Sequence, residues 1–372
     1  MMNRDTRLVA LALFLWGFGD GLYLYIQPLY IQQLGANPVQ IGGLLAAMSV
    51  VSALTYLPSG LLSDRLPRKW AMWGGWVSGM AGIFLVGLAR TWQGIVPGLL
   101  IYAFSAYCIP VINAYLAHAV DGRNLERIFA AVFAGYSAGA VISPAVGGWL
   151  AGVTTMRMVY FAAAGLFAIS TVVLLWVSPQ PVPPRVDQGQ RWGALLNRRF
   201  LRFAALTWLT FAAMYIGLPL TPNFLADVRG WNVTQVGILG SCHALGMTLL
   251  TLLLGRIGDG RRVKGIVVGQ VLMWCSMLLL LLGKAFPVLA LAYLLRGSLS
   301  GCFSLTRARV TTLGDKAERG LLLGTTETVI ASALIVAPYV AGWLYAGNPA
   351  YPFVASLALI PVMVLLNSLP PV

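Results

Sequence analysis

The chain has 372 residues, of which 59% are hydrophobic and 10% are charged. A soluble domain of this length cannot hide so much apolar surface, because its own exterior must face water. The net charge of +14 does not indicate nucleic-acid binding, because the basic residues stand in short clusters between apolar runs and form no basic arm. The composition therefore predicts a protein whose partner is the lipid bilayer and excludes nucleic acid.

Apolar runs long enough to cross a bilayer, about 20 residues each, recur along the whole chain. The first run lacks the short apolar core and the cleavage site of a signal peptide, so we expect it to remain as a helix. We predict twelve spans, at 8–34, 40–62, 70–89, 93–117, 128–151, 157–177, 201–226, 233–255, 264–283, 286–306, 321–345 and 350–369.

A proline-rich polar stretch that begins Pro179-Gln180-Pro181 separates two sets of six spans. We therefore predict an N-terminal six-helix bundle over 1–178, a linker over 179–200 and a C-terminal six-helix bundle over 201–372. The fold class is all-α.

The basic residues alternate between loops. Twenty of the 25 Lys and Arg fall in every second loop or at its edge, four (Arg90, Arg157, Arg229 and Lys284) fall in the others, and Arg296 alone falls in the interior of a span. Because Lys and Arg stay on the cytoplasmic side of a membrane, this split predicts that both termini and the linker are cytoplasmic. We expect the protein to lie in the plasma membrane.

The two halves repeat each other. Gln40-Ile41-Gly42 returns as Gln235-Val236-Gly237 at an offset of 195, and Ser143-Pro144 returns as Ala337-Pro338 at an offset of 194. Pro28 and Pro222 are also 194 residues apart. Several matches at nearly one offset predict a duplicated six-helix unit, which is a recurring plan of transporters.

Residues Gly60 to Lys69, with the sequence Gly-Leu-Leu-Ser-Asp-Arg-Leu-Pro-Arg-Lys, resemble the loop signature of the major facilitator superfamily, although Pro67 replaces a glycine. The resemblance implies that Asp64 meets the start of a neighbouring helix, and that the basic residues pair with acids and latch a cytoplasmic gate. Positive-inside topology alone would also explain the bases. The second copy keeps the acid as Asp259. The predicted gate consists of Gly60, Asp64, Arg65, Arg68, Lys69 and Asp259.

Gly139, Pro144, Gly147 and Gly148 in span five resemble the motif of the family's proton-coupled antiporters, with Ser143 in place of one glycine. A proline-kinked, tightly packed helix without any coupling role would fit the same residues. Span four lacks the arginine that is usual in the family's proton-coupled drug exporters, and Tyr102 stands at the position that the repeat pairs with Arg296.

Charges inside a membrane helix are unfavourable by about 2.5–3.5 kcal/mol each, so a functional role is the first interpretation. Asp20, Arg296 and Glu327 are the charged candidates for proton coupling or substrate binding, although Asp20 and Arg296 could also form a structural ion pair. His243 titrates in a suitable range, but a lone histidine in a span is more often a packing residue. The candidate cavity aromatics, which suit an amphipathic or cationic ligand, are Trp16, Tyr23, Tyr102, Tyr107, Trp208, Tyr215 and Tyr293.

The chain carries no nucleotide-binding loop and no hydrolase or metalloprotease motif, so we expect neither an enzyme nor a cofactor. Its four cysteines lie in apolar runs without metal-ligand spacing, which predicts free thiols and no metal site. We expect a monomeric, proton-coupled exporter of small amphipathic compounds. The alternatives are a symporter that imports a nutrient or an organic anion held by Arg296, and a membrane receptor or enzyme on the same scaffold.

Overall fold

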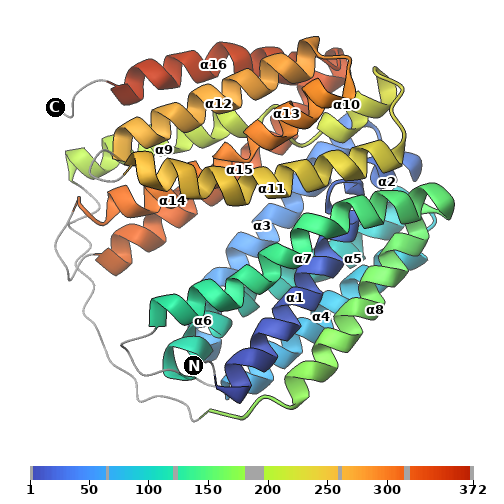
Figure 1. The fold of residues 1–372 in the computed structure, drawn as a ribbon, viewed down its shortest axis with the longest axis vertical. Coiled ribbons are helices and arrows are strands. Elements are labelled where there is room, and N and C mark those ends of the chain that lie inside the picture. Colours follow the sequence, from blue (N-terminus) through green and yellow to red (C-terminus); the bar gives the residue numbers. More distant parts are fainter. Residues whose placement is uncertain are drawn as a thin grey trace. The chain divides into compact units, whose positions relative to one another are not determined.

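A computed structural model describes residues 3–63, 67–119, 125–180, 197–258, 262–313 and 319–368. Every element in these ranges is a helix, as the all-α prediction requires (Figure 1). The first half contains α1 (Arg4–Leu24), α2 (Gln27–Gln33), α3 (Pro38–Ser63), α4 (Arg68–Leu88), α5 (Trp92–Phe104), the 3-10 turn η1 (Ser105–Tyr107), α6 (Cys108–Ala119), α7 (Leu125–Val153) and α8 (Met156–Leu175). The second half contains α9 (Arg198–Tyr215), α10 (Thr221–Asp227), α11 (Val233–Gly258), α12 (Arg262–Leu282), α13 (Phe286–Arg296), α14 (Ser298–Val310), α15 (Arg319–Gly347) and α16 (Tyr351–Ser368).

Eleven helices in the described part of the chain are long and apolar enough to cross a membrane, where the sequence predicts twelve spans. Two of the eleven are compound, because α5, η1 and α6 follow one another without a loop, as do α13 and α14. The predicted span that falls outside this set is the seventh, which corresponds to α9. Three arginines, Arg198, Arg199 and Arg202, occupy its first turns and lower its apolar content.

The first predicted span of each half is broken near its end. Instead of one helix over 8–34, α1 stops at Leu24 and α2 starts at Gln27, with Pro28 in its first turn. The second half repeats this break between α9 and α10, with Pro222 in the first turn of α10. Proline lacks a backbone N–H and has a helical φ, so it favours the start of a helix and disfavours continuation through it. The repeated proline pair therefore marks a repeated break.

The repeated glutamine has a local cause. Gln40 and Asn37 exchange side-chain and backbone hydrogen bonds of 2.9 Å at the start of α3, and Gln235 and Asn232 do the same at 2.9 and 3.0 Å at the start of α11. Each pair is a reciprocal cap, in which two otherwise unpaired backbone N–H groups of the first turn find acceptors. The sequence similarity at an offset of 195 thus reflects the same N-terminal cap at the start of α3 and of α11.

The described chain divides into two compact units. Unit 1 comprises Met1–Ala36, Ala47–Val186 and Trp231–Ser241, and unit 2 comprises Asn37–Ala46, Asp187–Gly230 and Cys242–Val372. These units group residues by packing and so differ from the predicted sequence boundaries, because the first residues of α3 pack in unit 2 and those of α11 pack in unit 1. The functional boundaries of the two bundles stay a prediction.

Glycines bring α7 very close to α1 inside unit 1. A Cβ atom on Gly139 would lie 2.6 Å from the Phe14 carbonyl oxygen and 2.7 Å from the Phe18 nitrogen, and one on Gly147 would overlap the backbone of Leu22. Small residues allow helix backbones to approach in this way, which replaces the missing hydrophobic driving force inside a bilayer. The antiporter-like motif is therefore a helix-packing seam in this structure. Its role in coupling stays a prediction.

Two further glycine contacts explain why the most similar segments of the repeat are similar. In unit 1, Gly148 of α7 packs on Gly237 of α11. In unit 2, Gly342 of α15 and Gly42 of α3 make the equivalent contact. In each unit, a Gln-x-Gly segment of the repeat therefore packs on a Pro-x-x-x-Gly segment. The two segments form the two sides of one helix interface, which accounts for their similarity between the halves.

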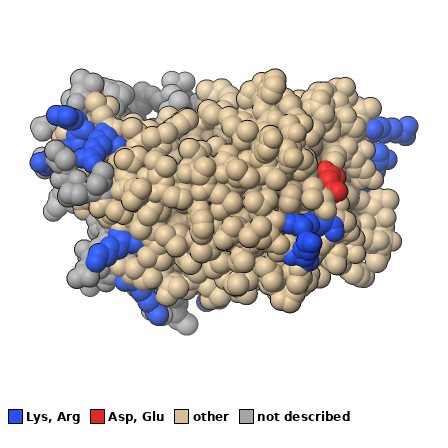
Figure 2. All heavy atoms as spheres, turned by 90° about the horizontal axis from the view of Figure 1, so that it is seen from above, with Lys and Arg blue, Asp and Glu red and all other residues tan. Residues whose placement is uncertain are grey.

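Charge is unevenly spread over the surface. On the face drawn in Figure 2, Lys and Arg side chains stand toward the two edges and the wide middle carries neither Lys, Arg, Asp nor Glu. Large apolar side chains such as Leu252, Leu365 and Trp343 are more than half exposed. An apolar exterior with charges at its margins suits a hydrocarbon layer flanked by water. The chain is a multi-pass membrane protein.

We expect Gly139→Ala to lower the stability of unit 1 by about 1–3 kcal/mol, because the added methyl group would push α1 and α7 apart. The measurement is the melting temperature of the purified protein in detergent. Gly165→Ala on α8 is the matched control, since a Cβ atom there meets nothing within 4 Å. The control should match or slightly exceed the parent. Equal stability of the two variants would show that the seam tolerates a side chain.

Candidate functional site

The carboxylate of Asp20 on α1 accepts three hydrogen bonds from tyrosine hydroxyls. Its Oδ1 atom accepts from Tyr23 at 2.6 Å and from Tyr102, and its Oδ2 atom accepts from Tyr136 at 2.9 Å. The donors stand on α1, α5 and α7. Hydrogen bonds to an ionised group are stronger than those between neutral groups, so one carboxylate joins three helices of unit 1.

Each tyrosine reaches Asp20 for a local reason. Tyr23 follows Asp20 by three residues, which places both side chains on one face of α1. Tyr102 stands near the end of α5, just before the 3-10 turn η1. Tyr136 precedes Gly139 by one turn of α7, and a Cβ atom on Gly17 of α1 would overlap the Tyr136 backbone. The close glycine contacts between α1 and α7 therefore place Tyr136 within hydrogen-bond distance of Asp20.

A cavity of about 360 Å³ opens beside this cluster, within unit 1. Its polar side chains are few and include Asp20, Ser52, Tyr102 and Tyr136. Most of the wall is apolar or aromatic and is formed by Leu13, Trp16, Met48, Trp76, Ile109, Ile112 and Phe133, among others. An apolar cavity with a small number of polar groups is the usual form of a small-molecule site. One carboxylate among aromatic rings suits a ligand that is largely apolar and carries a positive charge.

Aromatic stacking fixes the shape of this wall. The ring of Trp16 stacks on Phe167 of α8 with centroids 4.0 Å apart, and it lies nearly parallel to Tyr102 at 6.5 Å. Trp76 of α4 makes a tilted contact with Trp16, with centroids 5.0 Å apart, and donates its indole N–H to Ser170 at 2.8 Å. Offset and tilted ring pairs of this kind hold side chains in place, so the cavity is formed before any ligand enters.

The structure distributes the predicted aromatics among three settings. Trp16 and Tyr102 line the cavity, and Tyr23 binds Asp20. Tyr107 is buried and donates to the Ala71 carbonyl oxygen at 3.0 Å, so it packs. Three others belong to unit 2: Trp208, Tyr215 and Tyr293. Sequence reasoning missed three aromatic residues that line the cavity, namely Tyr136, Trp76 and Phe133. The position of Tyr136, one turn from Gly139 on a glycine-rich helix face, was an available signal.

Arg296 lies at the end of α13 in unit 2 and is 7% exposed. Its guanidinium stands over the ring of Tyr293 at 4.6 Å, a cation–π contact. It also interacts electrostatically with Tyr215 and His243. The ring of His243 lies 3.3 Å from the Tyr293 carbonyl oxygen. The predicted candidates Arg296, His243, Tyr215 and Tyr293 therefore form one cluster. Asp20 belongs to the other unit, so its pairing with Arg296 stays a prediction.

The two clusters share one equivalent position of the repeat. Tyr102 and Arg296 are 194 residues apart. The offset of 194 between Pro28 and Pro222, in the first span of each half, pairs Asp20 with Met214, the neighbour of Tyr215. Unit 1 therefore has a tyrosine beside its acid where unit 2 has an arginine, and the two polar clusters differ in charge.

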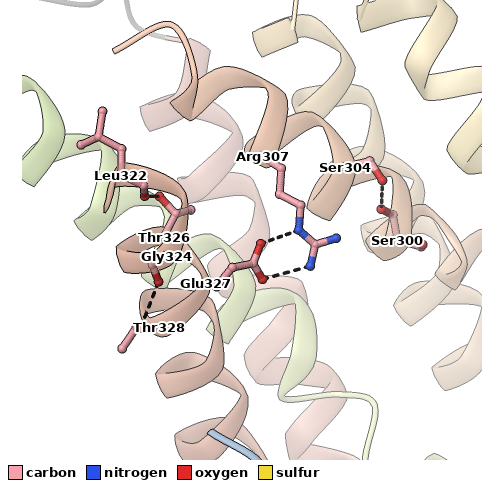
Figure 3. Close-up of polar contacts among 8 residues, drawn as sticks. All are labelled: Ser300, Ser304, Arg307, Leu322, Gly324, Thr326, Glu327 and Thr328. Atoms are coloured by element: carbon pink, nitrogen blue, oxygen red, sulfur yellow. Dashed lines mark hydrogen bonds and ion pairs between the residues drawn. The ribbon is translucent and has the colours of Figure 1, made fainter. Parts of the chain in front are cut away.

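Glu327 has a different partner from the other predicted site residues. It forms a two-pronged ion pair with Arg307, with Nε–Oε1 and Nη2–Oε2 distances of 2.5 and 3.0 Å (Figure 3). Arg307 was expected in a loop after the tenth span, but α14 continues to Val310 and carries it. Both side chains are about half exposed, at 51% and 45%. The pair links α14 to α15, and a role of Glu327 in coupling stays a prediction.

The predicted gate is described only in part. Asp64, Arg65 and Asp259 lie outside the described residues, and so do the surroundings of Gly60. Arg68 donates to the Gln180 side chain at 3.3 Å, and Lys69 donates to the Leu175 carbonyl oxygen at 2.8 Å. The two bases therefore contact the end of α8 and the first residues after it. The gate as a whole stays a prediction.

The family profile described as Major Facilitator Superfamily matches residues 9–232 and 203–371. This chain belongs to the major facilitator superfamily. The structure carries the family's fold, since it superimposes on the nucleoside transporter NupG with a TM-score of 0.82 and 18% identity, covering 98% of each chain. It also resembles the human organic anion transporter MFSD10 (TETRAN), with a TM-score of 0.68, 17% identity and coverage of 98% and 99%.

Two curated relatives extend along most of this member of the superfamily. Major facilitator superfamily domain-containing protein 10 of Bos taurus is 25% identical over 377 residues, which cover 90% of this chain and 80% of the relative. Multidrug resistance protein 1 of Bacillus subtilis is 23% identical over 356 residues, which cover 92% and 90%. The family and the structural neighbours are transporters, and this chain is a transporter of the same superfamily.

We expect Ala106→Phe to weaken the binding of a lipophilic cation about tenfold, or by about 1.4 kcal/mol, because Ala106 lines the cavity and a phenyl ring would occupy it. The measurement is the affinity of the purified protein for tetraphenylphosphonium. Ile169→Phe on the exposed side of α8 adds similar bulk away from the cavity and should bind as the parent does. Unchanged binding in Ala106→Phe would place the ligand elsewhere.

Proposed function

We propose that this transporter exports small amphipathic cations in exchange for protons, and that Asp20 binds both. The observation that carries the proposal is the Asp20 carboxylate, which accepts three tyrosine hydroxyls beside a largely apolar cavity. A proton and a cationic substrate would compete for this one negative charge. Such competition is the simplest way in which uptake of one can drive release of the other.

The tyrosines make the site sensitive to the ionisation state of Asp20. An ionised carboxylate accepts hydrogen bonds at both oxygens, whereas the protonated acid has one O–H that must donate. Protonation would therefore turn at least one of the three hydroxyls away or reverse its bond. Because the hydroxyls stand on α1, α5 and α7, this change would act on the packing of three helices at the cavity wall.

A gradient supplies the driving force in this proposal. One proton that crosses with the membrane potential releases about 2.3 kcal/mol per 100 mV, in addition to the contribution of the pH difference. Relatives named as multidrug resistance proteins support export. The basic loops of the predicted cytoplasmic side support a plasma-membrane orientation with both termini inside.

A second candidate function is the import of a nutrient or an organic anion together with protons. The buried guanidinium of Arg296, beside Tyr293 in unit 2, favours it because it could hold a substrate carboxylate. A structural neighbour is a nucleoside transporter and another is an organic anion transporter. The direction of net transport in inverted membrane vesicles separates the two functions.

We expect Asp20→Asn to abolish the accumulation of tetraphenylphosphonium that an imposed pH gradient drives in proteoliposomes, while downhill flux continues. Asparagine keeps the size of the side chain and cannot titrate. The matched control is Asp5→Asn, an acid at the other end of α1 that accepts a hydrogen bond from Tyr115 at 3.3 Å outside the cavity. Near-parental accumulation in Asp20→Asn would remove Asp20 from the coupling mechanism.

The proposed orientation predicts which loops face outside. Cysteines introduced next to Arg90 and Lys284 should react with a membrane-impermeant maleimide added to intact cells, because these residues belong to the sparsely basic loops. A cysteine next to Arg191, in the basic linker, should react only after permeabilisation. Labelling of the linker from outside would reverse the topology.

A further inference from the structure

The guanidinium of Arg296 is a buried charge in the described part of unit 2. The residue is 7% exposed, and its Nε and Nη1 atoms are buried and have no hydrogen-bond partner among the described residues. A buried charge that lacks a counter-charge and hydrogen bonds is strongly unfavourable, by several kcal/mol in proteins. The free-energy cost is higher inside a membrane helix, because no bulk water replaces the missing hydrogen-bond partners.

The described side chains of unit 2 that interact with the guanidinium of Arg296 carry no negative charge. Tyr293 offers the face of its ring, and His243 and Tyr215 are the groups that interact with the guanidinium electrostatically. The two carboxylates that the structure describes in unit 2 are engaged elsewhere. Asp227 accepts from Tyr345 at 2.9 Å, and Glu327 is paired with Arg307.

The repeat places no acid beside Arg296. In unit 1, Tyr102 hydrogen-bonds the acid Asp20. In unit 2, Arg296 stands in the place of Tyr102, and the offset of 194 puts Met214, next to Tyr215, in the place of Asp20. Unit 2 therefore carries a positive charge where the repeat supplies no carboxylate to balance it.

Close helix packing holds Arg296 in this position. A Cβ atom on Gly297, directly after Arg296, would overlap the backbone between Gly246 and Met247 of α11, and one on Gly246 would overlap the backbone of Leu294. These contacts fix the end of α13 against α11 and set the His243 ring at the Tyr293 carbonyl oxygen. The position of the Arg296 guanidinium is therefore fixed by the close packing of α13 against α11.

We propose that Arg296, with Tyr293 and His243, forms a binding site for a small monovalent anion. One negative charge neutralises the guanidinium, and its Nε and Nη1 atoms provide two donors for it. Arg296 and Tyr293 are buried, which favours an ion of the size of a halide or a small carboxylate group. His243 and Tyr215 are partly exposed and leave a side open for its entry. The residues of this site lie in unit 2, and the site does not depend on the direction of transport.

The test compares anions at equal ionic strength. The melting temperature of the purified full-length protein is measured in sodium chloride, bromide, acetate and gluconate. We expect chloride and bromide to raise it by about 2 °C or more over gluconate, and to do so with saturation. Arg296→Gln should lose the difference between chloride and gluconate. Arg307→Gln, which removes an exposed arginine of unit 2, should keep it.

The acetate arm identifies the source of the anion. Stabilisation by acetate beyond that of chloride would support the site and assign it to a carboxylate, as in a substrate. If Arg296→Gln does not fold, Arg296→Lys and the parent protein still decide the question. Arg296→Lys should shift the chloride concentration at half effect, and bromide crystals of the parent should show an anomalous peak beside Arg296. Equal melting temperatures of the parent in chloride, acetate and gluconate would overturn the proposal, as would an unaltered anion response in Arg296→Gln.

Discussion

The close approach of α1 and α7 is the constraint from which the site in unit 1 follows. Gly139 and Gly147 have no side chain to keep the two backbones apart, and Gly17 receives the backbone of Tyr136. This approach puts the hydroxyl of Tyr136 at Asp20, 2.9 Å from its carboxylate. With wider spacing the acid would face an apolar wall, where an ionised group without donors is unfavourable. The packing of α1 against α7 thus also provides a hydrogen bond to the Asp20 carboxylate.

The two repeated units are similar in their helix-packing segments and different in the side chains of their polar sites. Segments that pack on each other have stayed alike, because Gly148 on Gly237 and Gly342 on Gly42 each need two small partners. The side chains that face polar sites have diverged instead. Unit 1 holds a carboxylate among tyrosines, and unit 2 holds a guanidinium over Tyr293. A transporter built this way can present groups of opposite charge while both units keep one packing scheme.

Charged residues in the described spans fall into two energetic classes. Arg307 and Glu327 neutralise each other and remain about half exposed, so their pairing contributes modestly. Asp20 and Arg296 lie in more enclosed settings, where hydrogen bonds or counter-charges matter far more. Asp20 receives its hydrogen bonds from three tyrosines, whereas two nitrogens of Arg296 lack a protein partner among the described residues. Arg307 and Glu327 therefore form an ion pair that links two helices, whereas Asp20 and Arg296 are the charged groups better placed to bind ligands.

Local patterns along the chain were sufficient to predict the all-α class and the family, but not the breaks between α1 and α2 and between α9 and α10. Apolar length, the alternation of Lys and Arg, and the paired Pro28 and Pro222 all act over one helix or one loop. The same reasoning singled out Asp20 and Arg296, because a charge in an apolar run is unusual wherever it points. Only the tertiary structure decided the partners. Tyr136 joins Asp20, Glu327 turns to Arg307, and Tyr107 packs away from the cavity, since each outcome depends on which helix faces meet. The spacing along a single helix does not contain that information, because it depends on contacts between distant segments, such as that of Gly17 with Tyr136.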